Sequence, residues 1–179
     1  LGLQISVNVS AHHLQHGSFM PRLTEILAGH TAVPPGRLQL EVLETAALED
    51  MAGVSEIMRR CRAMGISFAL DDFGTGYSSL TYLKRLPAET LKIDQSFVRD
   101  ILVDPEDLAI VQGVLALSKA FGHHAIAEGV ETAEHGLALL ALGCELAQGY
   151  GIAMPMPAAE LPQWVKTWKP DPRWLSASV

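Results

Sequence analysis

The chain has 179 residues, of which 49% are apolar and 18% charged, so it can form one domain with a sizeable core and is not a disordered segment. Its 13 basic and 20 acidic side chains give a net charge of −7, which excludes a general binder of nucleic-acid polymers or of anionic membranes. An anionic ligand would therefore need a local positive charge, such as a bound divalent metal ion, to bind this chain.

Short runs rich in Val, Ile and Leu predict strands along the chain. In order they are Leu3–Val9, Leu38–Val42, Ile66–Leu70, Thr90–Ile93, Ala125–Ala127 and Glu145–Ala147. Apolar residues three and four apart predict helices between them, for example Met51–Met64, Leu108–Phe121 and Ala133–Leu142. This alternation of strand and helix predicts an α/β fold with a parallel sheet.

Each predicted strand delivers a polar or ionisable residue at its carboxyl end. These residues are Asn8, Glu41, Asp71 with Asp72, Lys92, Glu128 and Gln148. An active site assembled from many strand ends is typical of a (β/α)8 TIM-like barrel, whereas an open sheet concentrates function at one crevice. Alternation along the strands places Ser6, Asn8 and Glu41 inside such a barrel. It places Ile5 and Val7 outside, where the helices are expected to cover them.

The chain is short for a whole barrel, which has eight strands and about 250 residues. We therefore expect an N-terminally incomplete barrel domain over residues 1–169, with roughly 70 residues carrying the first strands before Leu1. Residues 170–179 read as a C-terminal tail that frays into a linker.

The acidic and amide residues among the strand ends form a set of oxygen donors. The set consists of Asn8, Glu41, Asp71, Asp72 and Glu128. Oxygen donors without histidine or cysteine suit Mg²⁺ or Mn²⁺ rather than Zn²⁺. A shared Asp71 could bridge two ions about 4 Å apart, as in-line attack on a phosphodiester requires. Lys92 could position the attacking water or offset charge on the phosphorus.

Other interpretations of these residues stay open at this point. Asp71 or Asp72 alone is more simply a helix cap ahead of Gly74 and Ser78. A Mg²⁺ barrel that abstracts a proton next to a carboxylate, with Lys92 as the base, is a second interpretation. A non-catalytic interaction module is a third, but it leaves the inward carboxylates unexplained.

The sequence resembles the EAL domain family. The most specific motif is DDFGTGYSSL at residues 71–80. Further matches, in the family's order, are Val7-Asn8-Val9-Ser10, Glu41-Val42-Leu43-Glu44-Thr45, Leu91-Lys92-Ile93-Asp94, Glu128-Gly129-Val130-Glu131-Thr132 and Gln148-Gly149-Tyr150. The resemblance implies a bacterial phosphodiesterase with a modified (β/α) barrel that hydrolyses cyclic di-GMP to linear pGpG with Mg²⁺ or Mn²⁺.

The resemblance also implies a role for each matching residue. Asn8, Glu41 and Asp71 would hold a first ion, and Asp71 with Asp72 a second. Lys92 would lie near the hydrolytic water, with Glu128 as general base or water-orienting residue. The supporting residues would be Glu44, which anchors the loop after Asp72, together with Asp94, Glu131 and Gln148.

The Glu-Ala-Leu motif of the family, which supplies another metal ligand, would lie before Leu1. We therefore expect the isolated chain to be impaired as an enzyme. The alternative is a catalytically inactive EAL-type receptor that binds cyclic di-GMP and signals by its shape.

The sequence also carries expectations about partners and location. The open strand edge leads us to expect a homodimer through Leu1–Val9, and the family resemblance implies the region 71–80 as the alternative. The resemblance also implies N-terminal sensor or GGDEF-type domains in the parent protein. Cys61 and Cys144 are too few for a disulfide framework and read as reduced, buried thiols of a cytoplasmic protein, which the family resemblance implies to be bacterial. The apolar run Gly136–Cys144 is about half of the ~20 residues that span a bilayer, so no membrane contact is expected.

Histidines and tryptophans offer weaker candidates. His12, His13 and His16 lack a further ligand at zinc spacing and read as a solvated helix face. Trp164 and Trp168 are four residues apart and read as a packed helix face.

Overall fold

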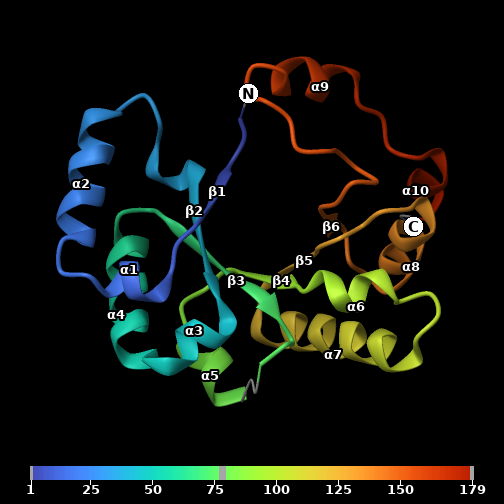
Figure 1. Cartoon of the computed structure of the whole chain (residues 1–179), viewed down its shortest axis with the longest axis horizontal. Coiled ribbons are helices and arrows are strands. Elements are labelled where there is room, and N and C mark those ends of the chain that lie inside the picture. The colour runs from blue at the N-terminus through green and yellow to red at the C-terminus, as the bar shows by residue number, and fades with distance from the viewer. Residues whose placement is uncertain (1, 77–79, 178–179) are drawn as a thin grey trace. The chain divides into compact units, whose positions relative to one another are not determined.

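The structure, a computed structural model, describes residues 2–76 and 80–177 (Figure 1). The strands are β1 (Ile5–Asn8), β2 (Leu38–Leu43), β3 (Ser67–Phe73), β4 (Thr90–Ile93), β5 (His124–Ala127) and β6 (Leu146–Ala147). The helices are α1 (Ala11–Gln15), α2 (Phe19–Gly29), α3 (Glu44–Glu49), α4 (Met51–Ala63), α5 (Leu80–Arg85), α6 (Gln95–Arg99), α7 (Pro105–Phe121), α8 (Ala133–Ala141), α9 (Leu161–Thr167) and α10 (Pro172–Ala177), with a 3-10 turn at Pro35–Arg37. Among the described residues, none of the helices has the length and apolar character to cross a membrane.

The chain divides into two compact units, and the division falls inside β4. The first unit comprises residues 2–91 and 121–124, and the second unit comprises residues 92–120 and those from Ala125 onward. Each is described by itself below.

The first unit is built on parallel strands that follow chain order. β1 pairs with β2 and β2 pairs with β3, both in parallel. The start of β4 joins through the Glu89 backbone N–H, which donates to the Phe68 carbonyl at 3.0 Å. Sheet order that repeats chain order is typical of a barrel and not of a doubly wound sheet.

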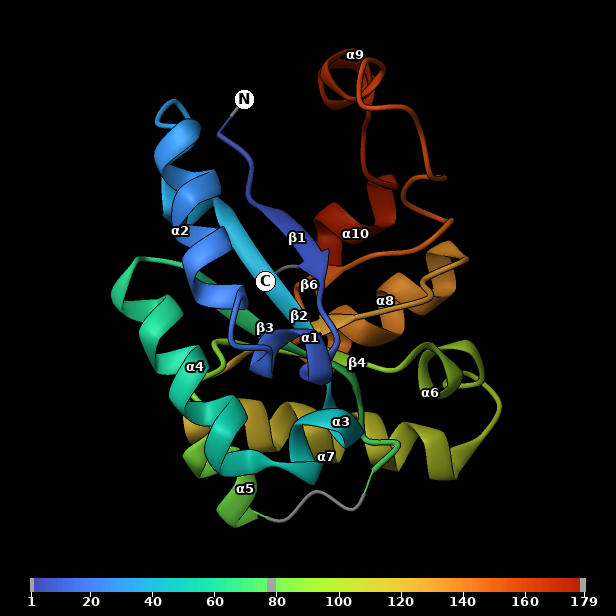
Figure 2. The same cartoon turned by 60° about the vertical axis from the view of Figure 1, so that its left-hand side comes forward.

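The core of the first unit lies between the sheet and helices α1 and α4. Leu14 of α1, Met58 and Cys61 of α4, and Phe68 and Leu70 of β3 are fully buried. α1 packs against both α2 and α4 (Figure 2). The apolar stripe of α4 recurs at helical spacing, which explains why the sequence predicts this helix almost to the residue.

The prediction for β1 is wrong in one respect. Ile5 and Val7 were expected to be covered by helices, yet they are 63% and 45% exposed. The physical reason is that β1 lies at the end of the sheet order, next to β2 alone among the described strands.

The second unit contains the rest of β4 with β5 and β6. The Glu128 backbone N–H donates to the Ile93 carbonyl at 3.1 Å, and β5 pairs with β6 in parallel. Ile93, Val98, Val111 and Val130 are fully buried in this unit. These residues come from β4, α6, α7 and the loop after β5, so the core of this unit includes residues of its strand, its helices and that loop.

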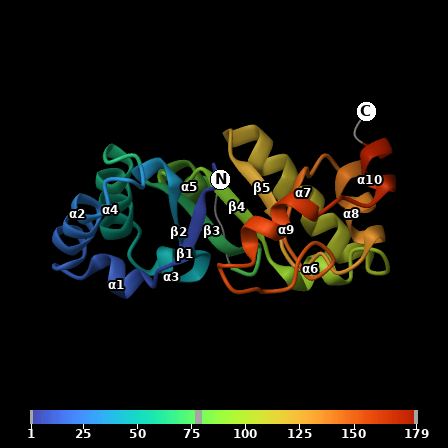
Figure 3. The same cartoon turned by 90° about the horizontal axis from the view of Figure 1, so that it is seen from above.

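The prediction that the chain frays from Pro170 onward is wrong over Pro172–Ala177, which forms α10 and packs on α8 (Figure 3). Trp174 Nε1 donates to the Ala133 carbonyl at 2.9 Å, and Arg173 Nη1 contacts Glu134 Oε1 at 2.7 Å. A Cβ at Gly136 would lie 2.5 Å from the Trp174 ring, so the glycine lets the two helices approach closely.

Candidate metal and substrate site

Strand register in the first unit brings three predicted metal ligands to one face of the sheet. Asn8 is the direct neighbour of Glu41, and Glu41 is the direct neighbour of Ala69. Asp71 lies two residues beyond Ala69 and therefore on the same face. Glu41 and Asp71 are buried and Asn8 is exposed. The shared face predicted from side-chain alternation is thus present in these strands.

Asp71 and Asp72 form a close pair of carboxylates at the end of β3. One oxygen of each lies within 4.8 Å of the other. Asp72 has a φ of 53°, the left-handed region that non-glycine residues rarely adopt and that Asp tolerates better than most. This backbone turn places two successive carboxylates close together, although successive side chains of a regular strand point to opposite faces.

The cap interpretation of this pair involves the loop that follows. The Asp72 carbonyl accepts hydrogen bonds from Thr75 Oγ1 at 2.9 Å and from the Thr75 backbone N–H at 3.4 Å. Ser78, the other residue of that interpretation, lies outside the described residues, as do Tyr77 and Ser79. The described contacts therefore hold the loop through the backbone of Asp72.

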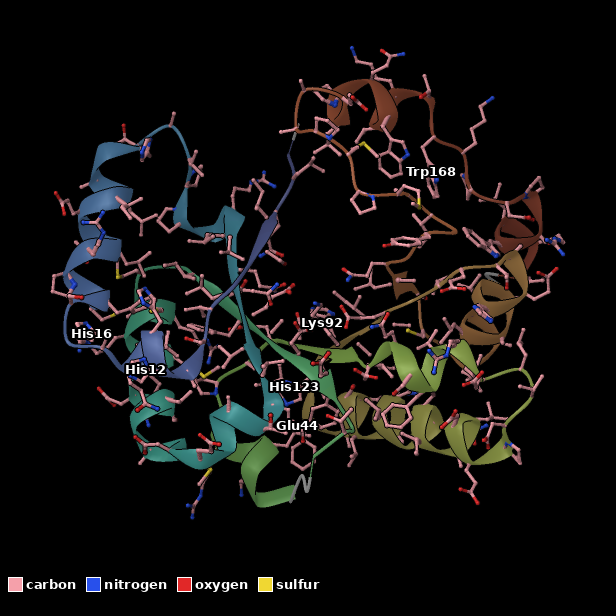
Figure 4. The ribbon with its side chains drawn as sticks, viewed as in Figure 1. His12, His16, Glu44, Lys92, His123 and Trp168 are labelled. Atoms are coloured by element: carbon pink, nitrogen blue, oxygen red, sulfur yellow. The ribbon has the colours of Figure 1, made fainter. Side chains whose placement is uncertain are left out.

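Glu44 contacts this loop from the start of α3 (Figure 4). Its side chain is fully buried, and its Oε2 accepts the backbone N–H of Gly74 at 3.0 Å. Burial raises the pKa of Glu44, while hydrogen bonds from the backbone of Gly74 and Gly76 oppose that rise. The contact with the loop that the family resemblance implied is present.

A polar chain of side chains supports the same face below Glu41. Ser6 Oγ donates to Gln39 Oε1 at 3.0 Å, and Gln39 Nε2 donates to Thr90 Oγ1 at 3.2 Å. Gln39 and Thr90 are buried. Their hydrogen bonds satisfy polar groups that would be costly to bury alone.

In the second unit, Glu128 is held by two other predicted residues. Its Oε1 lies 2.7 Å from Lys92 Nζ and accepts a hydrogen bond from Gln148 Nε2 at 2.7 Å. Lys92 is 4% exposed and Glu128 9%, so the ion pair is shielded from water. A charge-assisted contact of this length in a low-dielectric site fixes the glutamate in one position.

A cavity of about 470 Å³ adjoins Glu128 in the second unit. Its lining includes Glu128, Glu131 and Gln148, which the sequence singles out, and also Gln95, Tyr150 and Met154, which it does not. Tyr150 and Met154 are 63% and 58% exposed. Tyr150 belongs to the Gln148-Gly149-Tyr150 motif, so its position in that motif is the signal that could have identified it.

Asp94 has a local structural contact. Its Oδ1 accepts a hydrogen bond from the backbone N–H of Ser96 at 2.8 Å and also contacts Ser96 Oγ. Asp94 thereby caps the start of α6. Among the predicted supporting residues it therefore orders the backbone that follows Lys92.

The weaker candidates lie away from metal chemistry. His12, His13 and His16 are exposed, as expected of a solvated helix face (Figure 4). In the part of the chain that the structure describes, these histidines belong to no group of three ligands. The Trp164 and Trp168 rings lie 5.6 Å apart at a tilt of 37°, so they pack on each other.

The donors present fit a hard metal ion. Asn8, Glu41, Asp71 and Asp72 offer only oxygen, and Glu41 and Asp71 are buried on one face, where a cation lowers the cost of their like charges.

Residues 2–155 match the family model described as EAL domain. The chain is 42% identical over 157 residues to the bifunctional diguanylate cyclase/cyclic di-GMP phosphodiesterase MucR of Pseudomonas aeruginosa, covering 88% of this chain and 23% of MucR. It is 38% identical over 164 residues to the cyclic di-GMP phosphodiesterase PA2567 of the same organism, covering 92% and 28%. The chain thus spans about a quarter of the length of these curated relatives.

Solved structures give the same result for the fold. The MucR phosphodiesterase in complex with c-di-GMP superposes with a TM-score of 0.84 at 42% identity, covering 88% of this chain and 64% of that one. A manganese and cyclic di-GMP complex of Klebsiella pneumoniae BlrP1 gives a TM-score of 0.78 at 31% identity, covering 85% and 39%. The predicted α/β class with parallel strands is confirmed.

Proposed function

The chain belongs to the EAL domain family, and we propose that it provides the metal-binding and catalytic residues of a phosphodiesterase that hydrolyses cyclic di-GMP to linear pGpG. The observation that carries this proposal is the buried Glu128, which Lys92 and Gln148 both hold at one oxygen. A receptor that only binds the dinucleotide has no need for a buried acid and base fixed in this way. The similarity to relatives named as cyclic di-GMP phosphodiesterases supports the choice of substrate.

The proposed metal ligands all lie in the first unit. Asn8, Glu41 and Asp71 would hold one Mg²⁺ or Mn²⁺ ion, and Asp71 with Asp72 a second. The manganese complex of BlrP1 supports a divalent ion in this family. Bound divalent ions supply charge neutralisation at the phosphodiester and lower the pKa of coordinated water.

The proposed catalytic residues lie in the second unit. Glu128 would accept the proton of the attacking water as general base. Lys92 orients the glutamate through their 2.7 Å contact, and its positive charge would offset the negative charge that develops on the phosphoryl oxygens. Gln148 restrains the same carboxylate by donating a hydrogen bond to its Oε1. Glu131 lines the cavity beside Glu128, where it would support the substrate.

The test is chromatographic detection of pGpG with Mg²⁺ or Mn²⁺ present. It uses residues 1–179 and also the full-length protein, because the matched relatives are about four times longer. Glu128→Gln and Lys92→Ala should each lower turnover by roughly 10²–10⁴-fold. Glu145→Gln, a change of an exposed glutamate in the same unit, is the matched control.

The outcomes separate the enzyme from the receptor. A full-length protein that binds cyclic di-GMP but yields no linear product is the inactive EAL-type receptor. Variants at Glu128 or Lys92 that retain activity within tenfold of the unchanged protein remove those residues from proton transfer and charge stabilisation.

The partners and location of the protein are proposals of the same kind. We propose a cytoplasmic protein that forms a homodimer and is joined to sensor or GGDEF-type domains. The named cyclase activity of MucR supports the last point, and two free, buried thiols suit a reducing compartment. The exposed Ile5 and Val7 support association through β1; the alternative region 71–80 includes residues outside the described ones. A strictly monomeric species in sedimentation at micromolar concentration would contradict the dimer.

A further inference from the structure

Besides the cavity beside Glu128 in the second unit, the protein has a cavity in the first unit that the proposed reaction does not use. This hollow of about 510 Å³, the basic cleft, is lined by residues from three segments: α4, the chain from α5 to the start of β4, and residues 121–123. Its cationic and aromatic lining residues are Arg59, Arg62, Lys84, Arg85, Phe121 and His123.

The basic cleft lies at the amino end of β3. Glu89, which lines it, accepts the backbone N–H of Phe68 through Oε2 at 2.8 Å. Phe68 is the second residue of β3, whereas Asp71 lies three residues further along the same strand. At about 3.3 Å per residue, the two positions are separated by roughly 10 Å of strand. The cleft is therefore distinct from the proposed metal ligands of this unit.

The charge of the basic cleft is opposite to that of the whole chain. Four cationic side chains and one acid, Glu89, line it, whereas the chain carries a net charge of −7. Arg62 Nε contacts Glu89 Oε1 at 2.5 Å, and Arg59 Nη1 contacts Glu56 at 2.6 Å. Such local positive charge in an acidic protein attracts anions.

Lys84 and Arg85 supply the cationic groups that are available for a ligand. Both are exposed, and neither has an ion pair or side-chain hydrogen bond within the described part of the chain. Guanidinium and ammonium groups at the lining of a hollow are the usual means of binding phosphate.

The aromatic wall of the cleft favours a ligand with a flat ring. The Phe121 and His123 rings are stacked, with centroids 6.4 Å apart and an interplanar angle of 28°. Burial lowers the pKa of His123, so the imidazole is neutral at pH 7 and presents a ring face rather than a charge. Such rings serve as stacking surfaces for bases.

We propose that the basic cleft binds a small phosphorylated ligand of nucleotide size, with its phosphates on Arg62, Lys84 and Arg85 and its ring system against Phe121 and His123. The volume is within the range of small-molecule sites. A ligand that engages Arg62 competes with Glu89 for the guanidinium, and Glu89 holds the start of the strand that carries Asp71. Occupation of the cleft thus acts on the strand of the proposed metal site without touching it.

Calorimetry on the chain with EDTA present tests the proposal, because chelation removes metal-dependent binding elsewhere. The probes are ATP, inorganic tripolyphosphate, adenosine and a polyglutamate peptide. ATP and tripolyphosphate should bind and compete with each other, and adenosine should bind far more weakly. ATP binding more tightly than tripolyphosphate upholds both the phosphate contacts and the ring contact. Equal affinities uphold the phosphate contacts and overturn the contact of a ring system with Phe121 and His123.

Two pairs of variants locate the binding. Lys84→Glu with Arg85→Glu should weaken both phosphate probes by about tenfold or more, since charge-assisted hydrogen bonds are lost. Lys84→Ala with Arg85→Ala should act in the same direction with less risk to folding. The control, Lys119→Glu with Lys166→Glu, changes the net charge equally at exposed positions outside the cleft and should alter affinity less than twofold.

Three results would overturn the proposal. They are failure of both phosphate probes to bind at millimolar concentration, phosphate binding that the Lys84 and Arg85 variants leave unchanged, and preference for polyglutamate over both phosphate probes.

Discussion

Replacement of Glu44 by alanine is expected to release the loop that follows Asp72. Glu44 is fully buried at the start of α3, and its Oε2 accepts the Gly74 backbone N–H at 3.0 Å. Glu44→Ala removes this acceptor, so the Gly74 backbone N–H loses its hydrogen bond to Glu44. The loop then loses the contact that restrains it from the side of α3.

The magnitude follows from the hydrogen bond that is lost and from the cost of burying the ionised carboxylate, which oppose each other. A hydrogen bond to a charged acceptor contributes about 1.5–3 kcal/mol, and an unsatisfied buried donor costs about 1–3 kcal/mol. Burial raises the pKa of Glu44, so the ionised carboxylate is costly to keep in the folded protein. This cost offsets part of the stabilisation that the hydrogen bond to Gly74 provides. We expect Glu44→Ala to lower the free energy of unfolding by about 2–4 kcal/mol.

The same variant should weaken metal binding at the adjacent aspartates. The left-handed backbone of Asp72 costs about 1–2 kcal/mol and persists because the neighbouring loop is held in place. In the variant, the relaxed backbone of Asp72 must return to the left-handed conformation before metal binds. Each 1.4 kcal/mol that this return costs lowers the affinity for Mn²⁺ by about tenfold.

Urea unfolding and Mn²⁺ calorimetry measure the two effects. Glu49→Ala, an exposed glutamate of the same helix, is the matched control, and Glu44→Gln keeps one acceptor oxygen and should lie between the two. A free energy of unfolding for Glu44→Ala within about 0.5 kcal/mol of the control, with unchanged Mn²⁺ affinity, would refute the reasoning.

Three further predictions concern other parts of the chain. Asp71→Asn should weaken both proposed metal sites and Asp72→Asn one, so calorimetry that finds two unaltered Mn²⁺ sites in Asp71→Asn contradicts the bridging role. Gly149→Ala should lower the melting temperature, because a Cβ there would lie 2.3 Å from the N and O atoms of Val130, and an unchanged melting curve would show that this close approach is easily relieved. Hydrogen bonds from Arg173 lower the pKa of Glu134 and of Asp171 below their ordinary values of 4.5 and 3.8. The two carboxylates therefore stabilise the folded protein above their ordinary pKa values, and this stabilisation is lost as the pH falls through their lowered pKa values. Hydrogen exchange of the backbone of α10 should accelerate in acid. Arg173→Gln should remove this dependence of the exchange on pH.

The strands could be predicted well from the sequence because short apolar runs between turn residues have few alternatives. Thr90–Ile93 is predicted and observed with the same bounds. β3 instead extends past the predicted end at Leu70 to Phe73, because backbone pairing of Leu43 with Asp71 continues the ladder whatever the side chains are. Charged side chains thus conceal a strand end from a hydrophobic pattern.

The helix α10 shows what local patterns miss. Pro170 and Pro172 suggested a frayed tail, but Pro172 is the first residue of α10, a position where the absent N–H of proline costs nothing. The helix is stabilised by the contacts of Trp174 and Arg173 with α8, which are distant in sequence. Long-range packing of this kind leaves no local signal.

The candidate site divides in the same way. The sequence predicts that Asn8, Glu41 and Asp71, at the ends of successive strands, share one face of the sheet. The register of β1, β2 and β3 agrees with this prediction. That Lys92 and Gln148 contact the same oxygen of Glu128 could not be predicted, because it depends on side-chain conformations and on how far β4, β5 and β6 are offset.

The left-handed conformation of Asp72 imposes a second selection on this position during evolution. The proposed metal site selects a carboxylate there, while the backbone selects a residue that accepts a φ of 53°. In a descendant that has lost hydrolysis but keeps the fold, the first constraint disappears and the second remains. Drift at position 72 would then run toward Asn and Gly, which tolerate this conformation, before Glu or Ala. Asn or Gly at position 72, which keeps the backbone conformation but not the charge, would then indicate a relative that has lost the hydrolytic reaction.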